Sequence, residues 1–186
     1  MRVISGTARG THLLPPEDHK IRPTSDFIKE TLFNILQNDV VDSDFLDIFA
    51  GSGGIAIEAL SRGAKSAVMV ESSVISANLI RRNLEKTKLT KNAEVFVCDY
   101  KRAISELAGR KFSIIFLDPP YDQLLTESTL NCIMTEDLLA DGGIIIAETA
   151  RGAAPDNDFA IQLGLEIYRK KEYTATELIF LQRIGA

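Results

Sequence analysis

Four residues suited to recognising a ligand follow one apolar run in the second half of the sequence. The stretch IIFLDPPYD, residues 114–122, leads from apolar residues into Asp118, Pro119, Pro120 and Tyr121. The prolines lack N–H groups but keep their carbonyls, so the loop offers acceptors to a ligand that brings hydrogen-bond donors. An amino group on a base ring is such a donor, and Tyr121 provides a face on which the ring can stack.

A glycine-rich turn forms a second candidate site. The stretch DIFAGSGGIAIEAL, residues 47–60, is typical of a strand that turns into a helix, and its candidate binding residues are Asp47, Phe49, Ala50, Gly51, Ser52 and Gly53. Glycines allow a ligand to approach the backbone, and the helix N-terminus supplies N–H groups for a negatively charged or carboxylate-bearing group. We therefore expect a nucleotide-cofactor site at the carboxyl end of a sheet, although such turns also occur without a ligand.

Two acidic residues follow the next two predicted strands. Glu71 stands eighteen residues beyond Gly53, a spacing that suits hydrogen bonds to the hydroxyls of a ribose. Asp99 follows the third strand and either accepts a hydrogen bond from an adenine amino group or caps the next helix, and the sequence leaves both roles open. The turn reads G-S-G-G instead of GxGxxG, and Asp47 precedes it where dehydrogenases usually have an apolar residue. Both differences disfavour a nicotinamide or flavin enzyme.

The elements that must position these residues alternate between strands and helices. Apolar runs at 45–49, 67–71, 94–98, 113–118 and 142–148 are separated by helical patterns, and two alternating runs near 163–183 predict a C-terminal hairpin. Nearly continuous apolar strands indicate a parallel sheet covered on both faces. We predict an α/β fold with a doubly wound, mostly parallel seven-stranded sheet and an antiparallel finish.

The segment before this sheet predicts two further elements. Residues 1–20 read as a small β hairpin, and the region 21–40 contains a helix that Thr24 or Ser25 caps. The packing face predicted for this helix consists of Phe27, Ile28, Thr31, Leu32 and Ile35. Pro23 fixes the directions of Arg22 and Thr24, whose role is either functional or structural. We expect one domain over 1–186, with 44–186 forming the catalytic sheet.

Composition limits the class of protein. The chain has 186 residues, 45% of them hydrophobic and 25% charged, as expected for one globular domain. We expect a cytoplasmic protein without a membrane span or signal peptide. Cys98 and Cys132 lack metal-ligand spacing and are expected to be reduced and buried, and we expect no metal site around His12 or His19.

The net charge of −5 conceals an uneven distribution. Residues 61–111 carry eleven Lys and Arg against five acids, whereas residues 112–168 carry one Arg against ten acids. The asymmetry is compatible with a basic face for a nucleic acid, and also with cations that only solvate helices.

The motifs together resemble the class I S-adenosylmethionine (SAM) methyltransferases, and DPPY resembles those that methylate amino groups of bases. The stretches SGTARG (5–10), RPTSDFIKETLFNIL (22–36), DIFAGSGGIAIEALSRGA (47–64) and FLDPPYD (116–122) resemble the bacterial 16S rRNA guanine-N2 methyltransferases called RsmD. The match covers most of the chain. Ser72 and Ser73 depart from the family pattern, and the segment after Tyr121 matches no motif of the family.

The resemblance implies methyl transfer from SAM to N2 of a guanine in 16S rRNA, within a small ribosomal subunit or its precursor, with S-adenosylhomocysteine as product. It implies catalytic roles for residues 118–121 and adds Tyr100, Arg22 and Thr24 to the cofactor contacts. We expect phosphate contacts from Arg2, Arg9 and Arg22, with the 81–91 region a weaker candidate, and a monomer. Adenine-N6 or another base amino group in DNA or another RNA stays open as target, as does a non-catalytic SAM- or nucleotide-binding module.

Overall fold

The computed structural model describes residues 1–16, 26–120 and 123–185. The chain divides into two compact units, Met1–Asp99 and Tyr100–Ala186, and each is described by itself. The boundary falls inside the range 44–186 that is predicted as one catalytic sheet, and the assignment of a single domain stays a prediction. Arg22, Thr24, Ser25 and Tyr121 lie outside the described residues, as does Pro23.

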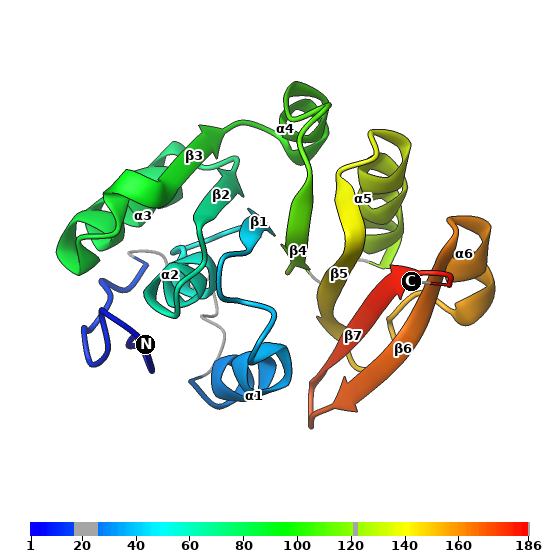
Figure 1. Ribbon diagram of the computed structural model, residues 1–186, viewed down its shortest axis with the longest axis horizontal. Coiled ribbons are helices and arrows are strands. Elements are labelled where there is room, and N and C mark those ends of the chain that lie inside the picture. The colour runs from blue at the N-terminus through cyan, green and yellow to red at the C-terminus, as the bar shows by residue number, and fades with distance from the viewer. Residues whose placement is uncertain (17–25, 121–122, 186) are drawn as a thin grey trace. The chain divides into compact units, whose positions relative to one another are not determined.

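The first unit consists of helices and parallel strands in alternation (Figure 1). Its elements are α1 (Asp26–Leu36), β1 (Asp44–Ile48), α2 (Gly54–Ser61), β2 (Ser66–Glu71), α3 (Val74–Thr87), the short 3-10 helix η1 (Thr90–Asn92) and β3 (Ala93–Val97). The strands pair in the order β3-β2-β1, all parallel. Because parallel strands end at the same edge, the turn after β1, Glu71 at the end of β2 and Asp99 after β3 lie along one edge.

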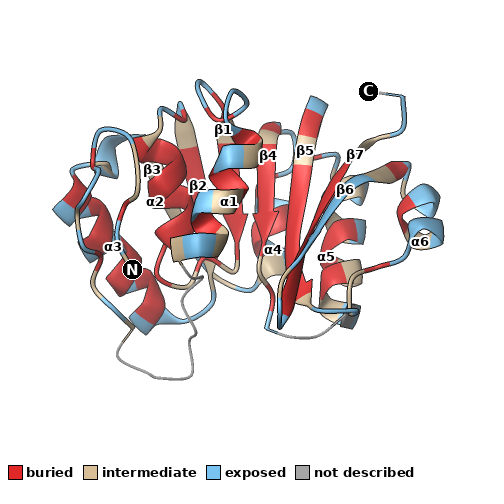
Figure 2. Cartoon of the chain, turned by 90° about the horizontal axis from the view of Figure 1, so that it is seen from below, coloured by how far each residue is buried: buried red, intermediate tan, exposed pale blue. Residues whose placement is uncertain are grey.

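Burial explains why these strands are nearly continuous apolar runs. Phe45, Leu46 and Ile48 of β1 are fully buried, and so is the interior of β2, as Figure 2 shows. The outer strand β3 is only half buried. A strand with helices on both faces has no solvent side, so its sequence does not alternate.

The second unit combines parallel strands with the predicted antiparallel hairpin. It contains α4 (Tyr100–Glu106), β4 (Phe112–Leu117), α5 (Gln123–Thr135), β5 (Leu139–Ala150), α6 (Asn157–Gln162), β6 (Leu165–Glu172) and β7 (Thr176–Arg183). Strand β4 is parallel to β5, while β7 is antiparallel to both β5 and β6. The carboxyl ends of β4, β5 and β6 therefore share one edge. The predicted fold class, seven mostly parallel strands with an antiparallel finish, is confirmed.

The predicted packing face of α1 is wrong in part. The buried face of α1 consists of Lys29, Leu32, Phe33 and Leu36, which is one position further along than predicted, and Phe27 is 66% exposed. The cause is Lys29, whose charge suggests a solvent-facing position although its side chain is fully buried. The predicted N-terminal hairpin is present but short: it has one antiparallel bridge, between Arg2 and His12, and backbone hydrogen bonds join Val3 to Thr11 and Leu13 to Met1.

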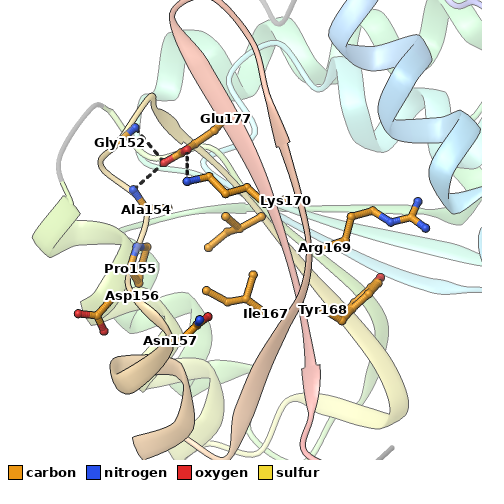
Figure 3. A pocket seen from close by; sticks show the side chains of 11 residues that line it. Gly152, Ala154, Pro155, Asp156, Asn157, Ile167, Tyr168, Arg169, Lys170 and Glu177 are labelled. Carbon is orange, nitrogen blue, oxygen red and sulfur yellow. Dashed lines mark hydrogen bonds and ion pairs between the residues drawn. The ribbon is translucent and has the colours of Figure 1, made fainter.

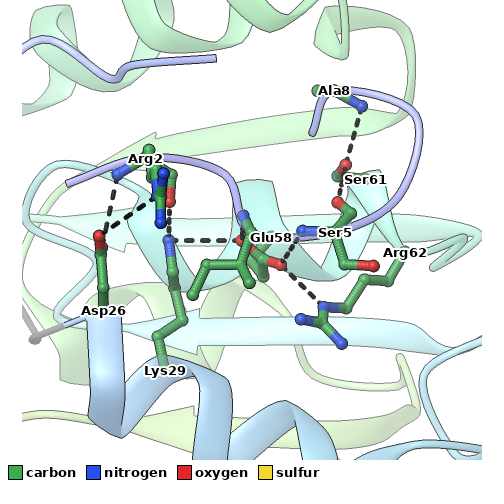
Figure 4. Close-up of polar contacts among 9 residues, drawn as sticks. Arg2, Ser5, Ala8, Asp26, Lys29, Glu58, Ser61 and Arg62 are labelled. Atoms are coloured by element: carbon green, nitrogen blue, oxygen red, sulfur yellow. Dashed lines mark hydrogen bonds and ion pairs between the residues drawn. The ribbon is translucent and has the colours of Figure 1, made fainter. Parts of the chain in front are cut away.

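Backbone groups of the N-terminal segment pair with side chains of α2 instead of forming a longer ladder. Glu58 accepts hydrogen bonds from the N–H groups of Ile4 (2.8 Å) and Ser5 (3.0 Å), as Figure 4 shows for this region. The hydroxyl of Ser61 donates to the carbonyl of Ser5 at 2.6 Å and accepts from the N–H of Ala8 at 2.9 Å. The segment therefore follows α2 closely.

A buried ionic cluster fixes the same helix to α1. The Lys29 Nζ lies 3.3 Å from Glu58 Oε2 and also donates to the carbonyl of Arg2, while Arg62 Nε donates to Glu58 Oε1 at 2.8 Å. Burial lowers the pKa of Lys29, and the charge of Glu58 opposes that shift. Loss of one member would leave the others as poorly compensated buried charges, which costs about 3–5 kcal/mol.

Gly6→Ala should release the N-terminal segment from α2. Gly6 has a φ of +83°, and a Cβ there would lie 1.7 Å from the carbonyl oxygen of Ser61. Gly10→Ala is the matched control, because Gly10 has the same φ and no atom within 4 Å of its Cβ position. We expect the control to lose about 1–2 kcal/mol of unfolding free energy through backbone strain, and Gly6→Ala about 1–3 kcal/mol more. Urea unfolding measures both, and equal losses would contradict the prediction.

Candidate functional site

The turn after β1 is held in a strained conformation by bonds to the next strand. The N–H groups of Phe49 and Ala50 both donate to the carbonyl of Val70, at 3.1 and 2.9 Å. Phe49 and Gly51 have positive φ angles of 71° and 56°. A non-glycine residue in this region is uncommon and marks a position that the surroundings enforce.

Gly53 ends the turn as the N-cap of α2. Its φ of 77° is left-handed, and no side chain caps the helix at this position. A Cβ on Gly53 would lie 3.3 Å from the side chain of Ile80 in α3. The glycine thus allows close packing of α2 against α3 and leaves the N-terminal N–H groups of α2 without a capping side chain at position 53.

Asp47 lies beneath this turn and is buried. Its Oδ2 accepts a hydrogen bond from the N–H of Ala56 at 3.2 Å. Burial raises the pKa of Asp47 to about 7, the bond from Ala56 opposes the shift, and the charge of Glu71 adds to it. Near neutral pH, Asp47 can therefore gain or lose a charge when a charged ligand binds.

The carboxylate of Glu71 joins the glycine turn to the start of α3. Its Oε2 accepts from the N–H of Gly51 at 3.0 Å, and its Oε1 accepts from the N–H of Ser73 at 2.8 Å. Each oxygen can accept a further hydrogen bond, so a pair of ligand hydroxyls can bind to a carboxylate that is already oriented. The structure brings Glu71 and the glycine turn together, and the predicted bonds from Glu71 to ribose hydroxyls stay a prediction.

Asn83 is a positioning residue that the sequence analysis missed. Its fully buried amide donates to the carbonyl of Ser52 at 3.0 Å and accepts from the N–H of Leu14 at 2.7 Å. It thereby connects the glycine turn with the N-terminal segment. The available signal was an amide within the apolar stripe of α3, between Ile80 and Leu84, because a buried amide needs partners.

Asp99 and Tyr100 stand at the end of the first unit and the start of the second. Asp99 is exposed and directly precedes α4, so its two predicted roles, adenine acceptor or helix cap, both stay open. The hydroxyl of Tyr100 lies 3.0 Å from that of Ser128 in α5. Tyr100 therefore has a structural contact within the second unit, and its predicted cofactor contact stays a prediction.

The acceptor loop in the second unit begins directly after β4. Asp118 is half buried, Pro119 is buried and Pro120 is exposed. Phe116 and Leu117, which precede them, are fully enclosed in the core and anchor the strand. Asp118 thus leaves the carboxyl end of a rigid strand, where parallel α/β proteins bind ligands.

The cations predicted to bind RNA differ in their surroundings. Arg2 is exposed, with its Nε 3.8 Å from Asp26 Oδ2. Arg9 is exposed on the N-terminal segment, and among the described residues no hydrogen bond or ion pair engages its side chain. In the 81–91 region, all five cations are exposed.

Cys98 and Cys132 form no disulfide, and both are half buried, so they are less enclosed than expected. In the described parts of the chain, no three His, Cys, Asp or Glu residues are grouped so as to hold a metal ion. Among the helices of those same parts, none is long and apolar enough to cross a bilayer.

Comparison with known proteins shows the family. The model of a family described as conserved hypothetical protein 95 matches residues 1–182. YlbH of Bacillus subtilis, a candidate rRNA methyltransferase, is 39% identical over 188 aligned residues that cover both chains completely. The ribosomal RNA small subunit methyltransferase D of Escherichia coli is 39% identical over 151 residues, 80% of this chain and 74% of the relative.

The fold agrees with that relationship. The solved structure of YhhF from Escherichia coli, a candidate methyltransferase, has a TM-score of 0.82 and 33% identity over 98% of this chain and 97% of its own. This chain belongs to the RsmD family of methyltransferases. The resemblance carried by the SGTARG, glycine-turn and DPPY motifs is confirmed.

Asp47→Asn should alter how stability depends on pH. The unfolded carboxyl loses its proton near pH 4 and the folded one near pH 7, so the native protein loses unfolding free energy as the pH rises between these values. The Asp47→Asn variant lacks this loss. Urea unfolding at pH 5 and pH 8 should show that the variant gains roughly 2–3 kcal/mol relative to the native protein at the higher pH. The same difference at both pH values would show that Asp47 does not titrate in this range.

Proposed function

We propose that this RsmD-family protein transfers a methyl group from SAM to the N2 amino group of a guanine in small-subunit ribosomal RNA, in the cytoplasm. The observation that carries the proposal is the combination of a glycine turn whose acids are oriented for a nucleoside cofactor with an Asp-Pro-Pro loop at the end of β4, in a chain of this family. The rRNA names of the relatives support the choice of RNA.

The glycine turn offers hydrogen-bonding groups and open space that match the parts of SAM. Gly51 and Gly53 leave the backbone open to a ligand, and Glu71 presents free lone pairs to the ribose hydroxyls. Asp47, with its pKa near 7, can become charged opposite the ammonium group of the methionine part. When bound, SAM supplies an electrophilic methyl group on its sulfonium. The residues assigned to SAM binding are Asp47, residues 49–53, Glu71 and Asp99. The family resemblance adds Tyr100, Arg22 and Thr24.

The Asp-Pro-Pro loop would hold the nucleophile. The N2 lone pair of guanine is delocalised into the ring, so the amine needs acceptors that favour a pyramidal nitrogen and stabilise the positive charge that develops on it. The Asp118 carboxylate and the Pro119 carbonyl are those acceptors, and Tyr121 would stack on the unstacked base. The N–C bond forms as the C–S bond breaks, S-adenosylhomocysteine leaves, and the proton lost from N2 passes to Asp118. Alignment at about 3 Å and exclusion of water supply most of the rate.

The RNA would be held by the N-terminal cations. Arg9, exposed on the segment fixed to α2, is the best placed for a phosphate contact, and Arg2 and Arg22 are assigned the same role. The protein is proposed to act as a monomer on a small subunit or its assembly intermediate.

Nucleoside analysis tests the proposed reaction. The protein is incubated with SAM that carries a labelled methyl group and with naked 16S rRNA, small subunits or DNA, and the labelled nucleoside is identified after digestion. We expect N2-methylguanosine from one of the ribosomal substrates. N6-methyladenine, in RNA or DNA, would replace the proposed target by adenine, and SAM binding without transfer to any substrate would indicate a binding module.

Asp118→Asn should reduce methyl transfer by roughly 10²–10³-fold, because the variant loses the negative charge that stabilises the developing cation. SAM affinity, measured by calorimetry, should stay unchanged. Asp141→Asn is the matched control, because it makes the same change at an exposed residue near the amino end of β5. Near-native turnover of Asp118→Asn with normal SAM affinity would remove Asp118 from the mechanism.

A further inference from the structure

Strand β6 carries an irregularity next to three consecutive cations. Its sequence runs Tyr168, Arg169, Lys170 and Lys171, and the pairing with β7 shifts between Ile167 and Arg169. Ile167 faces Leu181 and Arg169 faces Phe180, so Tyr168 is the extra residue at which the register shifts. Such a bulge redirects side chains that regular alternation would send to opposite faces.

The bulge gathers an aromatic ring and two cations on one face. Arg169 and Lys171 lie opposite Phe180 and Leu178, and residues directly opposite each other share a face. The ring of Tyr168 lies 6.2 Å from that of Phe180. Figure 3 shows Tyr168 and Arg169 pointing away from the hollow into which Ile167 and Lys170 project.

The cations on this face are available to a ligand, whereas Lys170 on the other face is not. Lys170 Nζ lies 2.7 Å from Glu177 Oε2 and 3.6 Å from Glu172, and Arg151 also pairs with Glu172. Arg169 and Lys171 are exposed, and within the described residues neither has an ion pair or a side-chain hydrogen bond. The acids of the other face, Glu172 and Glu177, are thus paired with Lys170 and Arg151, whereas Glu166, on the same face as Arg169, accepts a hydrogen bond from Gln182 at 2.7 Å.

The position of this face suits a substrate that extends from Asp118. The carboxyl ends of β4 and β6 share one edge, with β5 and β7 between them. Three strand spacings correspond to about 14 Å, a distance that two or three nucleotides of single-stranded RNA can span. Residues 112–168 carry one Arg against ten acids, so this is the first positive run after the acceptor loop.

We propose that Tyr168, Arg169 and Lys171, the β6 surface, bind the RNA strand next to the target guanine. The two cations contact phosphates, and the tyrosine ring stacks on an unpaired base. The inference rests on the proposed function, because it takes the RNA that this function names as the ligand. The β6 surface positions the RNA and has no part in the chemical step.

Protection of an edge strand is the other role that a bulge and charged residues can have. Such protection requires charge of either sign, since any charged side chain opposes pairing with another strand. RNA binding requires positive charge. Arg169→Glu combined with Lys171→Glu therefore separates the two roles, because it keeps the protection and removes the phosphate contacts.

The main experiment measures RNA binding against salt concentration. We expect Arg169→Ala with Lys171→Ala to reduce the slope of log affinity against log salt by about 1.4, which corresponds to two phosphate contacts on single-stranded RNA. Lys65→Ala with Lys111→Ala is the matched control: it removes two exposed cations at the amino ends of β2 and β4, and its slope should stay native. The doubly reversed variant should bind RNA more weakly than the alanine variant while its unfolding midpoint stays native.

Enzyme kinetics and the tyrosine give an independent readout. In the β6 variants the KM for RNA should rise while kcat at saturating RNA and SAM affinity stay native. Tyr168→Ala should weaken RNA binding roughly tenfold and Tyr168→Phe should restore it, because stacking needs the ring alone. An unchanged salt slope, or an equal change in the control, would overturn the inference about β6. The proposed function would still hold if the native protein transfers methyl groups to RNA. Absence of transfer to any RNA by the native protein would instead remove the proposed function.

Discussion

The buried carboxylate of Glu58 is the interaction on which the N-terminal segment, α1 and the start of α2 depend. It accepts two backbone N–H groups of the N-terminal segment and pairs with Lys29 of α1 and with Arg62. A buried carboxylate is stable only when such partners compensate its desolvation. The helix that carries Glu58 begins at the glycine turn, so the proposed cofactor site and the segment that presents Arg9 are both fixed to α2. A change in either therefore reaches the other through one rigid helix.

The glycine turn, the proposed cofactor site, is shaped by backbone groups and takes its charge from two acids. The carbonyl of Val70 and the amide of Asn83 hold the turn from β2 and α3, so its strained angles do not require a ligand. Asp47 and Glu71 repel each other, and burial makes Asp47 the one that gives up its charge. In the proposed reaction, the ammonium group of the cofactor would offset this repulsion. The site is therefore complementary to a ligand that carries both hydroxyls and a positive charge.

The parallel strands, and with them the places where the candidate site residues follow strand ends, could be predicted from the sequence, because burial on both faces produces continuous apolar runs. Predictions failed where a polar residue is buried. Because Lys29 is buried, the buried face of α1 lies one position further along than predicted. Asn83 was not recognised at all. In both cases the partner lies far away in the sequence: Glu58 for Lys29, and Leu14 and Ser52 for Asn83. A pattern of local hydrophobicity contains no information about such partners.

The surroundings of the charged residues in the β6 surface could not be predicted from the sequence either. Regular alternation in β6 would place Tyr168 and Arg169 on opposite faces, and the sequence RKK then indicates only a solvated edge. The shifted register with β7 places them on the same face, and Glu177 and Glu172 engage Lys170 on the other face. The net charge of −5 reveals neither the shared face nor the pairing of Lys170. Affinity for a polyanion depends on which exposed cations share a face and form no ion pair, so a chain with an excess of acids can present a local site for RNA.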